Sequence, residues 1–238
     1  MRCKITAIVF GLSALTLLAD TTTTQPVQVT STEHVNFAAG GTIRVNNAAG
    51  YLSVDGWDQP EVEITVVKSL GYDREPAVRA TALLEKTQIA IQHISNTELA
   101  ISTTRTGPNG RFHNPFGIDR AVMVEYRIRV PRNSHIMIDH ADGYASVTGV
   151  TGNIEASSRR GDIILMLADL ASYAIDAHTK LGAVTADVTG ATRRKRLTGE
   201  TFRYGDASLA HKLSLDMGFG GITIKELPPE AVTPVTSR

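Results

Sequence analysis

The segments IMIDHADGYASV (136–147), IEASSRRGDIIL (154–165), IDAHTKLGAVTA (175–186) and LSLDMGFGGITI (213–224) share one twelve-residue pattern. Each has apolar residues seven and five positions before a glycine and two and four positions after it; these glycines are Gly143, Gly161, Gly182 and Gly220. Apolar residues at a spacing of two place one face of a strand in a core. The glycine between the two strands predicts a corner, where a residue without Cβ is favoured.

Two further copies extend the repeat. The segment IRVNNAAGYLSV (43–54) fits the whole pattern around Gly50, whereas the segment around Gly205 fits only the second half, with Ala207 and Leu209. Repeated strand–corner–strand units are typical of solenoids, in which each coil buries its apolar residues against its neighbours. We therefore predict an all-β, parallel β-solenoid over residues 134–225. The alternative is an antiparallel β-sandwich, which the uneven spacing of the corners favours.

The N-terminal segment has the layout of a secretory signal peptide. A short basic start with Arg2 and Lys4 precedes an apolar run from Ile5 to Ala19. This pattern predicts a signal peptide over residues 1–19, either cleaved or kept as an anchor, followed by a polar linker over 20–36. Export to the periplasm or the cell surface follows. The only cysteine is Cys3, so a cleaved chain has no disulfide and no cysteine site.

Residues 37–133 are expected to form the N-terminal part of the same domain as the coils. Alternation predicts strands within 41–67, a hairpin of 88–93 with 99–103, and a strand over 122–130. Asp73–Lys86 has the apolar stripe of a helix, which we expect to cap an open end of the sheet. Trp57 is expected to cover an end of the core, the alternative being a sugar-stacking surface. The proline-containing tail, 226–238, is predicted to be disordered.

Charge is balanced, with 24 basic and 24 acidic residues, so nucleic acid is not expected as a partner. The predicted partner is an envelope or extracellular ligand: a polysaccharide, an anionic lipid or a protein. Two segments are the candidate contacts, a long loop at 107–117 and a basic run. Their ligand-contact residues are Arg111, Phe112, His113, Arg193, Arg194, Lys195 and Arg196. A solvated hairpin tip and a solvated connector are the alternative interpretations.

No motif in the sequence indicates catalysis. His140, Ser157, His178 and Asp216 are expected to form an outward column beside the corners, with Asp139 and Asp142 nearby. A metal or acid–base site is conceivable there, but exposed polar corners are the favoured interpretation. The aspartates are dispersed, and no phosphate loop, nucleophile elbow or calcium loop is present. We expect no catalytic residue, no metal and no cofactor. The alternatives are a carbohydrate-active lyase or hydrolase on a β-helix, and a purely structural envelope protein.

The strands of 41–67, the predicted helix and hairpin, the YRIRVP segment (126–131) and the glycine-centred coils together resemble the bacterial "putative adhesin" family, also called the Toastrack domain. The resemblance covers roughly residues 35–225. It implies a fold similar to a right-handed β-helix and a location at the cell envelope, where some members are associated with stress systems. The family has no defined biochemical function, and it implies no catalytic residue. The expected function is that of an exported, non-enzymatic binding module.

Overall fold

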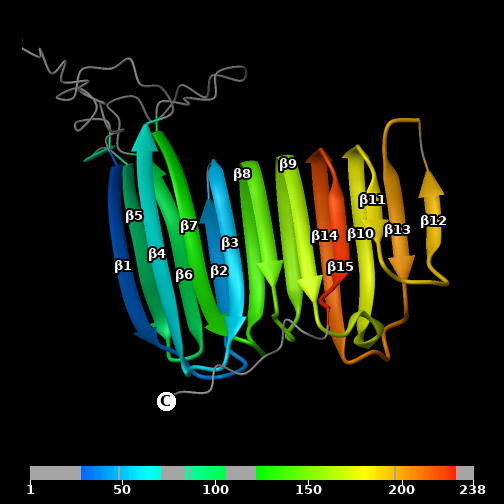
Figure 1. The fold of residues 1–238 in the computed structure, drawn as a ribbon, viewed down its shortest axis with the longest axis horizontal. Helices are drawn as coiled ribbons and strands as arrows, with labels where there is room; N and C mark the ends of the chain where they lie inside the picture. Colours follow the sequence, from blue (N-terminus) through cyan, green and yellow to red (C-terminus); the bar gives the residue numbers. More distant parts are fainter. Residues whose placement is uncertain are drawn as a thin grey trace, which may run out of the picture.

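A computed structural model describes residues 28–47, 49–70, 84–85, 87–105, 122–195 and 197–228. The described chain is all-β, with fifteen strands in one mixed sheet and a single turn of 3-10 helix at Leu170–Ser172. The sheet folds over at glycine corners into two layers that enclose one apolar core (Figure 1). The structure therefore confirms the predicted all-β class.

The first layer runs across nine strands. In spatial order it contains β5 (Thr87–Ser95), β6 (Glu98–Arg105), β2 (Thr42–Asn47), the first halves of β8 (His135–Thr148) and β9 (Ile154–Leu167), β14 (His211–Phe219), β10 (Tyr173–Leu181), β13 (Glu200–Tyr204) and β12 (Thr192–Lys195). Pairing is parallel from β6 to β10 and antiparallel at both ends.

The second layer faces the first. It contains β1 (Gln28–Asn36), β4 (Glu61–Leu70), β7 (Val122–Pro131), β3 (Gly50–Trp57), the second halves of β8 and β9, β15 (Ile222–Glu226) and β11 (Val184–Ala186). β8 and β9 pass through both layers, so they join the two into one continuous sheet.

Five corner glycines lie side by side where the chain passes from the first layer to the second. Their spatial order is Gly50, Gly143, Gly161, Gly220 and Gly182. All have φ between +116° and +145°. A Cβ on each would collide with the backbone of the preceding strand, and from Gly143 onward the obstacle is the carbonyl oxygen of the preceding corner glycine. Only glycine allows this combination of positive φ and close backbone approach.

Neighbouring strands pair so that residues at equivalent positions of the sequence repeat lie opposite one another. Ile43 pairs with Ile136, Ile136 with Ile154, and Ile154 with Leu213, so equivalent residues of the copies form rows inside the core. The apolar residues of the five complete copies are buried, except Ala186, which is partly buried. The prediction was wrong for Gly205: it lies in the turn between β13 and β14, and Ala207 is exposed.

A simple solenoid predicts that successive copies stack in sequence order, and the observed order differs. The copy containing β14 and β15 lies between β9 and the copy containing β10 and β11, although it follows both in sequence. Antiparallel strands complete both ends (Figure 1). The fold is thus an open mixed sheet in two layers, with parallel pairing in its centre, and not the antiparallel sandwich either.

Of the segments predicted outside the repeat, the hairpin and one strand are confirmed, whereas the linker is wrong in part. Gln28–Asn36 was expected to be linker but forms the edge strand β1, whose residues are exposed except for Val35. The hairpin at 88–103 and the strand at 122–130 are confirmed as β5, β6 and β7. The signal peptide (1–19) and most of the 226–238 tail lie outside the described residues. So does the capping helix, apart from the helical residues Leu84 and Glu85.

Replacing Gly161 by alanine tests the corner constraint. We expect Gly161→Ala to lower the free energy of unfolding by about 4 kcal/mol or more, because its Cβ would overlap the carbonyl oxygen of Gly143. Gly190→Ala is the matched control: its φ is also positive, +80°, but a Cβ there meets nothing within 4 Å. The control should cost only the backbone strain of about 1–2 kcal/mol. Chemical denaturation measures both, and equal losses would contradict the constraint.

Candidate ligand-binding face

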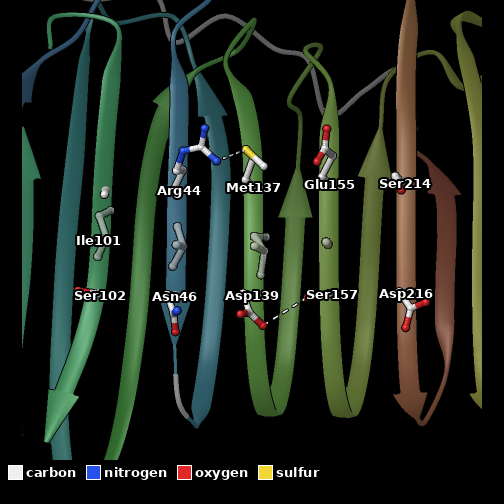
Figure 2. A pocket seen from close by; sticks show the side chains of 14 residues that line it. Arg44, Asn46, Ile101, Ser102, Met137, Asp139, Glu155, Ser157, Ser214 and Asp216 are labelled. Atoms are coloured by element: carbon white, nitrogen blue, oxygen red, sulfur yellow. Dashed lines mark hydrogen bonds between the residues drawn. The ribbon is translucent and has the colours of Figure 1, made fainter. Parts of the chain in front are cut away.

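A depression of about 540 Å³ lies on the outer face of the first layer. It crosses β6, β2, β8, β9 and β14, and we call it the groove (Figure 2). Its outward side chains belong to Arg44, Asn46, Ala100, Ser102, Met137, Asp139, Glu155, Ser157, Ser214 and Asp216. Four inward-pointing residues between them, Val45, Ile101, Ile138 and Ala156, complete the lining.

Strand register places the outward side chains in two rows (Figure 2). The upper row contains Ala100, Arg44, Met137, Glu155 and Ser214. The second row, which we call the polar row, contains Ser102, Asn46, Asp139, Ser157, Asp216 and His178. Beyond His178 the polar row continues through Thr201 to Arg194. Because hydrogen-bonded strands lie about 4.7–4.9 Å apart, each row repeats polar groups at that interval.

The polar and charged side chains of the groove contact neighbouring side chains but keep free hydrogen-bonding capacity. Arg44 donates to Glu98 Oε1 (3.0 Å) and to the sulfur of Met137. Ser157 donates to Asp139 Oδ1 (3.3 Å), and His178 Nδ1 lies 3.5 Å from Asp216 Oδ2. A carboxylate has about four acceptor sites, so Asp139 and Asp216 keep acceptor capacity for a ligand.

The groove has an acidic balance. Its lining includes one basic residue, Arg44, and three acidic ones, Asp139, Glu155 and Asp216. No group of three or more histidine, cysteine or acidic side chains is arranged to hold a metal ion within the part of the chain that the structure describes. The arrangement therefore offers hydrogen-bond acceptors and donors on an open surface, suited to a polar ligand without net negative charge.

The predicted basic contact run divides between different environments. Arg193 faces the interior side of β12: it donates to Val184 O (2.7 Å) and Glu200 Oε1 (3.2 Å), and its guanidinium lies over the ring of Phe202. Glu200 is only 3% exposed and also accepts from Val184 N. Arg193 is thus the partner of a buried carboxylate. All residues of the edge strand β12 are exposed, and the Arg193 side chain itself is 41% exposed; what distinguishes it from Arg194 and Lys195 is its contact with Glu200.

The remaining predicted contact residues are not described. Arg111, Phe112, His113 and Arg196 lie outside the described residues. Of the three predicted contacts that the structure describes, Arg193, Arg194 and Lys195, Arg194 joins the polar row, at its far end. The other predicted contact residues stay a prediction.

The predicted outward column is correct for Ser157, His178 and Asp216 and wrong for His140. The residue that pairs with Ser157 in the outward row is Asp139, whereas His140 points inward and is 1% exposed. His140 is three residues before its corner glycine, and the other members are four residues before theirs. One position along a strand reverses the direction of the side chain.

Sequence reasoning missed Asn46 and Arg44 as surface-site residues, and it placed Asp139 near the predicted column and not in it. The signal was present, since counting four residues back from each corner glycine gives Asn46, Asp139, Ser157, His178 and Asp216. What the sequence did not provide is the spatial order of the strands that makes this set contiguous.

The side chains next along the strands from the polar row point into the core. They form a second row, which we call the buried row and which is polar except for one methionine. It contains Asn47, His140, Ser158, Met217, Thr179 and Glu200, all less than 5% exposed. Thr103 connects it to Tyr126 of the facing layer through a 2.7 Å hydrogen bond, and burial raises the pKa of Tyr126 to about 12.

His140 is the least satisfied member of this buried row. Neither of its ring nitrogens, nor Nδ2 of Asn47, has a hydrogen-bond partner among the described residues. Burial lowers the pKa of His140; the nearby carboxylates of Asp142 and Asp139 and the backbone at Gly50 and Asp142 act in the opposite direction but do not outweigh it. The ring is therefore held neutral inside the core.

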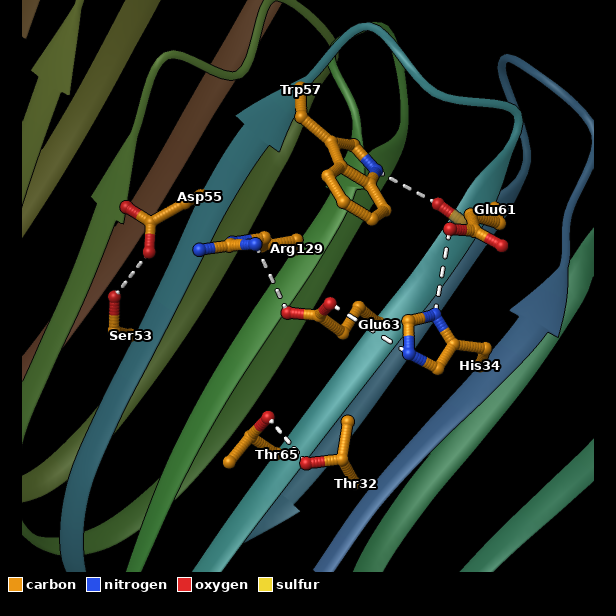
Figure 3. Close-up of polar contacts among 9 residues, drawn as sticks. All are labelled: Thr32, His34, Ser53, Asp55, Trp57, Glu61, Glu63, Thr65 and Arg129. Atoms are coloured by element: carbon orange, nitrogen blue, oxygen red, sulfur yellow. Dashed lines mark hydrogen bonds and ion pairs between the residues drawn. The ribbon is translucent and has the colours of Figure 1, made fainter.

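The outer face of the second layer carries a self-contained polar network (Figure 3). Arg129 lies 3.3 Å from Glu63, and His34 lies 3.4 Å from Glu61. Trp57 was expected to cover an end of the core; instead it is half-buried on this face, with Arg129 over its ring and its indole N–H donating to Glu61 O. These partners satisfy one another, so the network stabilises β1, β4, β7 and β3.

No family model matches the chain, and no curated protein matches it. A crystal structure described as a "putative cell adhesion protein" from Clostridium sporogenes aligns over 85% of this chain and 100% of its own, with 13% identity and a TM-score of 0.49. A "putative adhesin" from Bacteroides fragilis aligns over 82% and 97%, with 12% identity and a TM-score of 0.26. A "putative lipid binding protein" from Parabacteroides distasonis aligns over 84% and 97%, with 8% identity and a TM-score of 0.23.

With TM-scores this low, these similarities support no argument about what the chain binds, and the resemblance to the Toastrack family stays a prediction. Within the described residues, no helix has the length and apolar character needed to cross a membrane.

Arg193 and Arg194 allow a matched comparison on one strand. We expect Arg193→Ala to lower the free energy of unfolding by about 2–3 kcal/mol, because it removes one partner of the buried Glu200. Arg194→Ala removes an exposed side chain and should change it by less than about 0.5 kcal/mol. Thermal and denaturant unfolding measure both variants. Equal effects would show that Arg193 has no structural role.

The buried imidazole of His140 predicts acid sensitivity. Because its folded pKa lies below its unfolded value of about 6.5, the unfolded chain binds more protons once the pH falls below that value. Stability should thus be full above about pH 6.5 and decrease on acidification. We expect His140→Leu to reduce this decrease between about pH 7.5 and 5.5. The exposed-face variant His178→Gln is the control and should retain it; an unchanged decrease in His140→Leu would refute the assignment.

Proposed function

We propose that this protein is a non-catalytic binding module that holds a neutral, hydroxyl-rich glycan chain in the groove of the first layer. The observation that carries the proposal is the polar row, in which Asn46, Asp139, Ser157, Asp216 and His178 follow one another on five adjacent strands. A sugar hydroxyl both donates and accepts, so a row of mixed donors and acceptors fits a polymer of such groups.

Rigidity supports the same function. The row is built on paired strands and not on loops, so its side chains need little ordering when a ligand binds. The hydrogen bond from Ser157 to Asp139 and the 3.5 Å contact between His178 and Asp216 restrict these side chains further. Extended faces of repeated strands are well suited to extended ligands, because each strand contributes the same kind of contact.

The charge of the groove favours a neutral glycan over the anionic partners considered from the sequence. Arg44, the basic residue of the lining, is already engaged by Glu98, and three carboxylates remain. An anionic lipid surface or an acidic polysaccharide placed there would be repelled by those carboxylates. Exposed basic side chains lie at the far end, on β12, outside the groove.

Binding without turnover is supported by the surroundings of the carboxylates. Glycosidases need one carboxyl group that stays protonated, which burial in an apolar pocket provides. Asp139 and Asp216 instead lie exposed on an open strand face, where Ser157 donates to Asp139 and His178 lies 3.5 Å from Asp216. Export of the chain, predicted from residues 1–19, would place such a module where extracellular glycans occur.

Calorimetric titration of the full chain with neutral oligosaccharides (glucan, mannan and xylan fragments) tests the proposal. We expect saturable binding without release of shorter products. The variant carrying Asn46→Ala, Asp139→Ala and Asp216→Ala should bind at least about tenfold more weakly, since it loses three of the hydrogen-bonding groups of the row.

Thr32→Ala with Thr65→Ala provides the control. These hydroxyls are bonded to each other on the opposite face, and their loss should leave binding unchanged. Binding to heparin but to none of the neutral fragments would contradict the proposal. Release of shortened fragments would instead favour the alternative function, a carbohydrate-active enzyme.

A further inference from the structure

A second surface, on the opposite face of the molecule, combines an exposed aromatic ring with a fixed ion pair. Tyr51 on β3 and Tyr144 on β8 directly follow the corner glycines and pair in register. Their rings are stacked, with centroids 5.2 Å apart and planes within 4°. Tyr51 is 39% exposed, so one ring of the stack is open to solvent.

A hollow of about 510 Å³ borders this ring, and we call it the tyrosine slot. It is lined by Tyr51, Ser53, Glu125 and Arg127. Arg127 contacts Glu125 Oε1 at 2.7 Å through both Nε and Nη2, which fixes the two charged groups on the strand beside Tyr51. The slot therefore presents an aromatic surface together with guanidinium N–H donors and a carboxylate acceptor.

We propose that the tyrosine slot binds a single pyranose ring, independently of the groove. A pyranose has an apolar face of C–H groups and a rim of hydroxyls. The first suits the ring of Tyr51, and the second suits Arg127 and Glu125. Tyrosine gives such contact area at low entropic cost, and here stacking on Tyr144 already restricts the ring.

Other ligands that use aromatic surfaces fit the slot less well. A quaternary ammonium group needs the negative faces of aromatic rings and no competing cation, whereas Arg127 lines this slot. A nucleotide whose base stacked on Tyr51 would place its phosphate near Glu125, which would repel it. Asp162, which pairs in register with Tyr144, adds a second carboxylate on the far side of the stack. Burial, followed by the charges of Tyr51 and Asp162, raises the pKa of Tyr144, so its hydroxyl stays neutral at physiological pH.

Nuclear magnetic resonance titration of the full chain with methyl hexopyranosides tests this site. At about 100 mM, a site with a dissociation constant of a few millimolar is nearly saturated. We expect shifts of the Tyr51 ring and Arg127 Nε signals that saturate, and Tyr51→Ala should abolish them. Arg127→Gln keeps the stacked rings and should weaken binding at least fivefold without lowering the melting temperature, an effect that a purely structural role of Tyr51 would not produce.

Two comparisons make the result decisive. The triple variant of the groove should retain the titration in full, which separates this site from the proposed function of the groove. Adenosine monophosphate should give no saturable shift at the slot. The proposal is overturned if no hexopyranoside shifts the slot signals, if the groove variant abolishes the shifts, or if the nucleotide binds in their place.

Discussion

The structure depends on the close approach of backbone at its five corner glycines. At Gly143, Gly161, Gly220 and Gly182, the carbonyl oxygen of the preceding corner occupies the space of a Cβ. The chain can then turn from one layer to the other at the same height on adjacent strands. This fixes the register of both layers together, because β8 and β9 continue through the corner without interruption. The core rows of isoleucine, leucine and valine follow from that register.

In-register stacking turns a repeat in the sequence into rows in space. Residues four positions before the corners point outward and form the polar row, whereas those three positions before the corners point inward and form the buried row. A slip of one residue would exchange the two sets, exposing the core and burying Asp139 and Asp216. Burial of Ile136, Ile138 and their equivalents in the core therefore fixes the positions of the surface side chains as well. The groove is a consequence of the core.

The repeat itself could be predicted because strand alternation and the corner glycine are local properties of the chain. The order of the copies could not, since β10, β9 and β14 present similar buried rows of isoleucine, leucine and alanine and any two could pair. β1 was missed because nearly all of its side chains are exposed, so it has no apolar alternation. His140 was misplaced by one position, which in a strand means the opposite face. In the sequence, Arg193 is simply one of four consecutive basic residues. Its partner Glu200 lies on the neighbouring strand β13, and the burial of Glu200 cannot be read from the basic residues themselves.

The polar groups of the described residues lie in two different environments, the closed core and the open strand faces. Catalysis requires groups held away from water, where their protonation and electrostatic effect can be tuned. The groups that the interior does hold, His140, Asn47 and Glu200, are sealed in the core or bonded to the framework. Those that a ligand can reach, in the groove and in the tyrosine slot, lie on open strand faces and are held rigid by their neighbours. A rigid and repetitive surface can bind a ligand at little entropic cost, because few side chains must be ordered on binding. The same corners that make the polar row regular thus keep it on the outer face of the first layer, where a ligand can reach all of its members together.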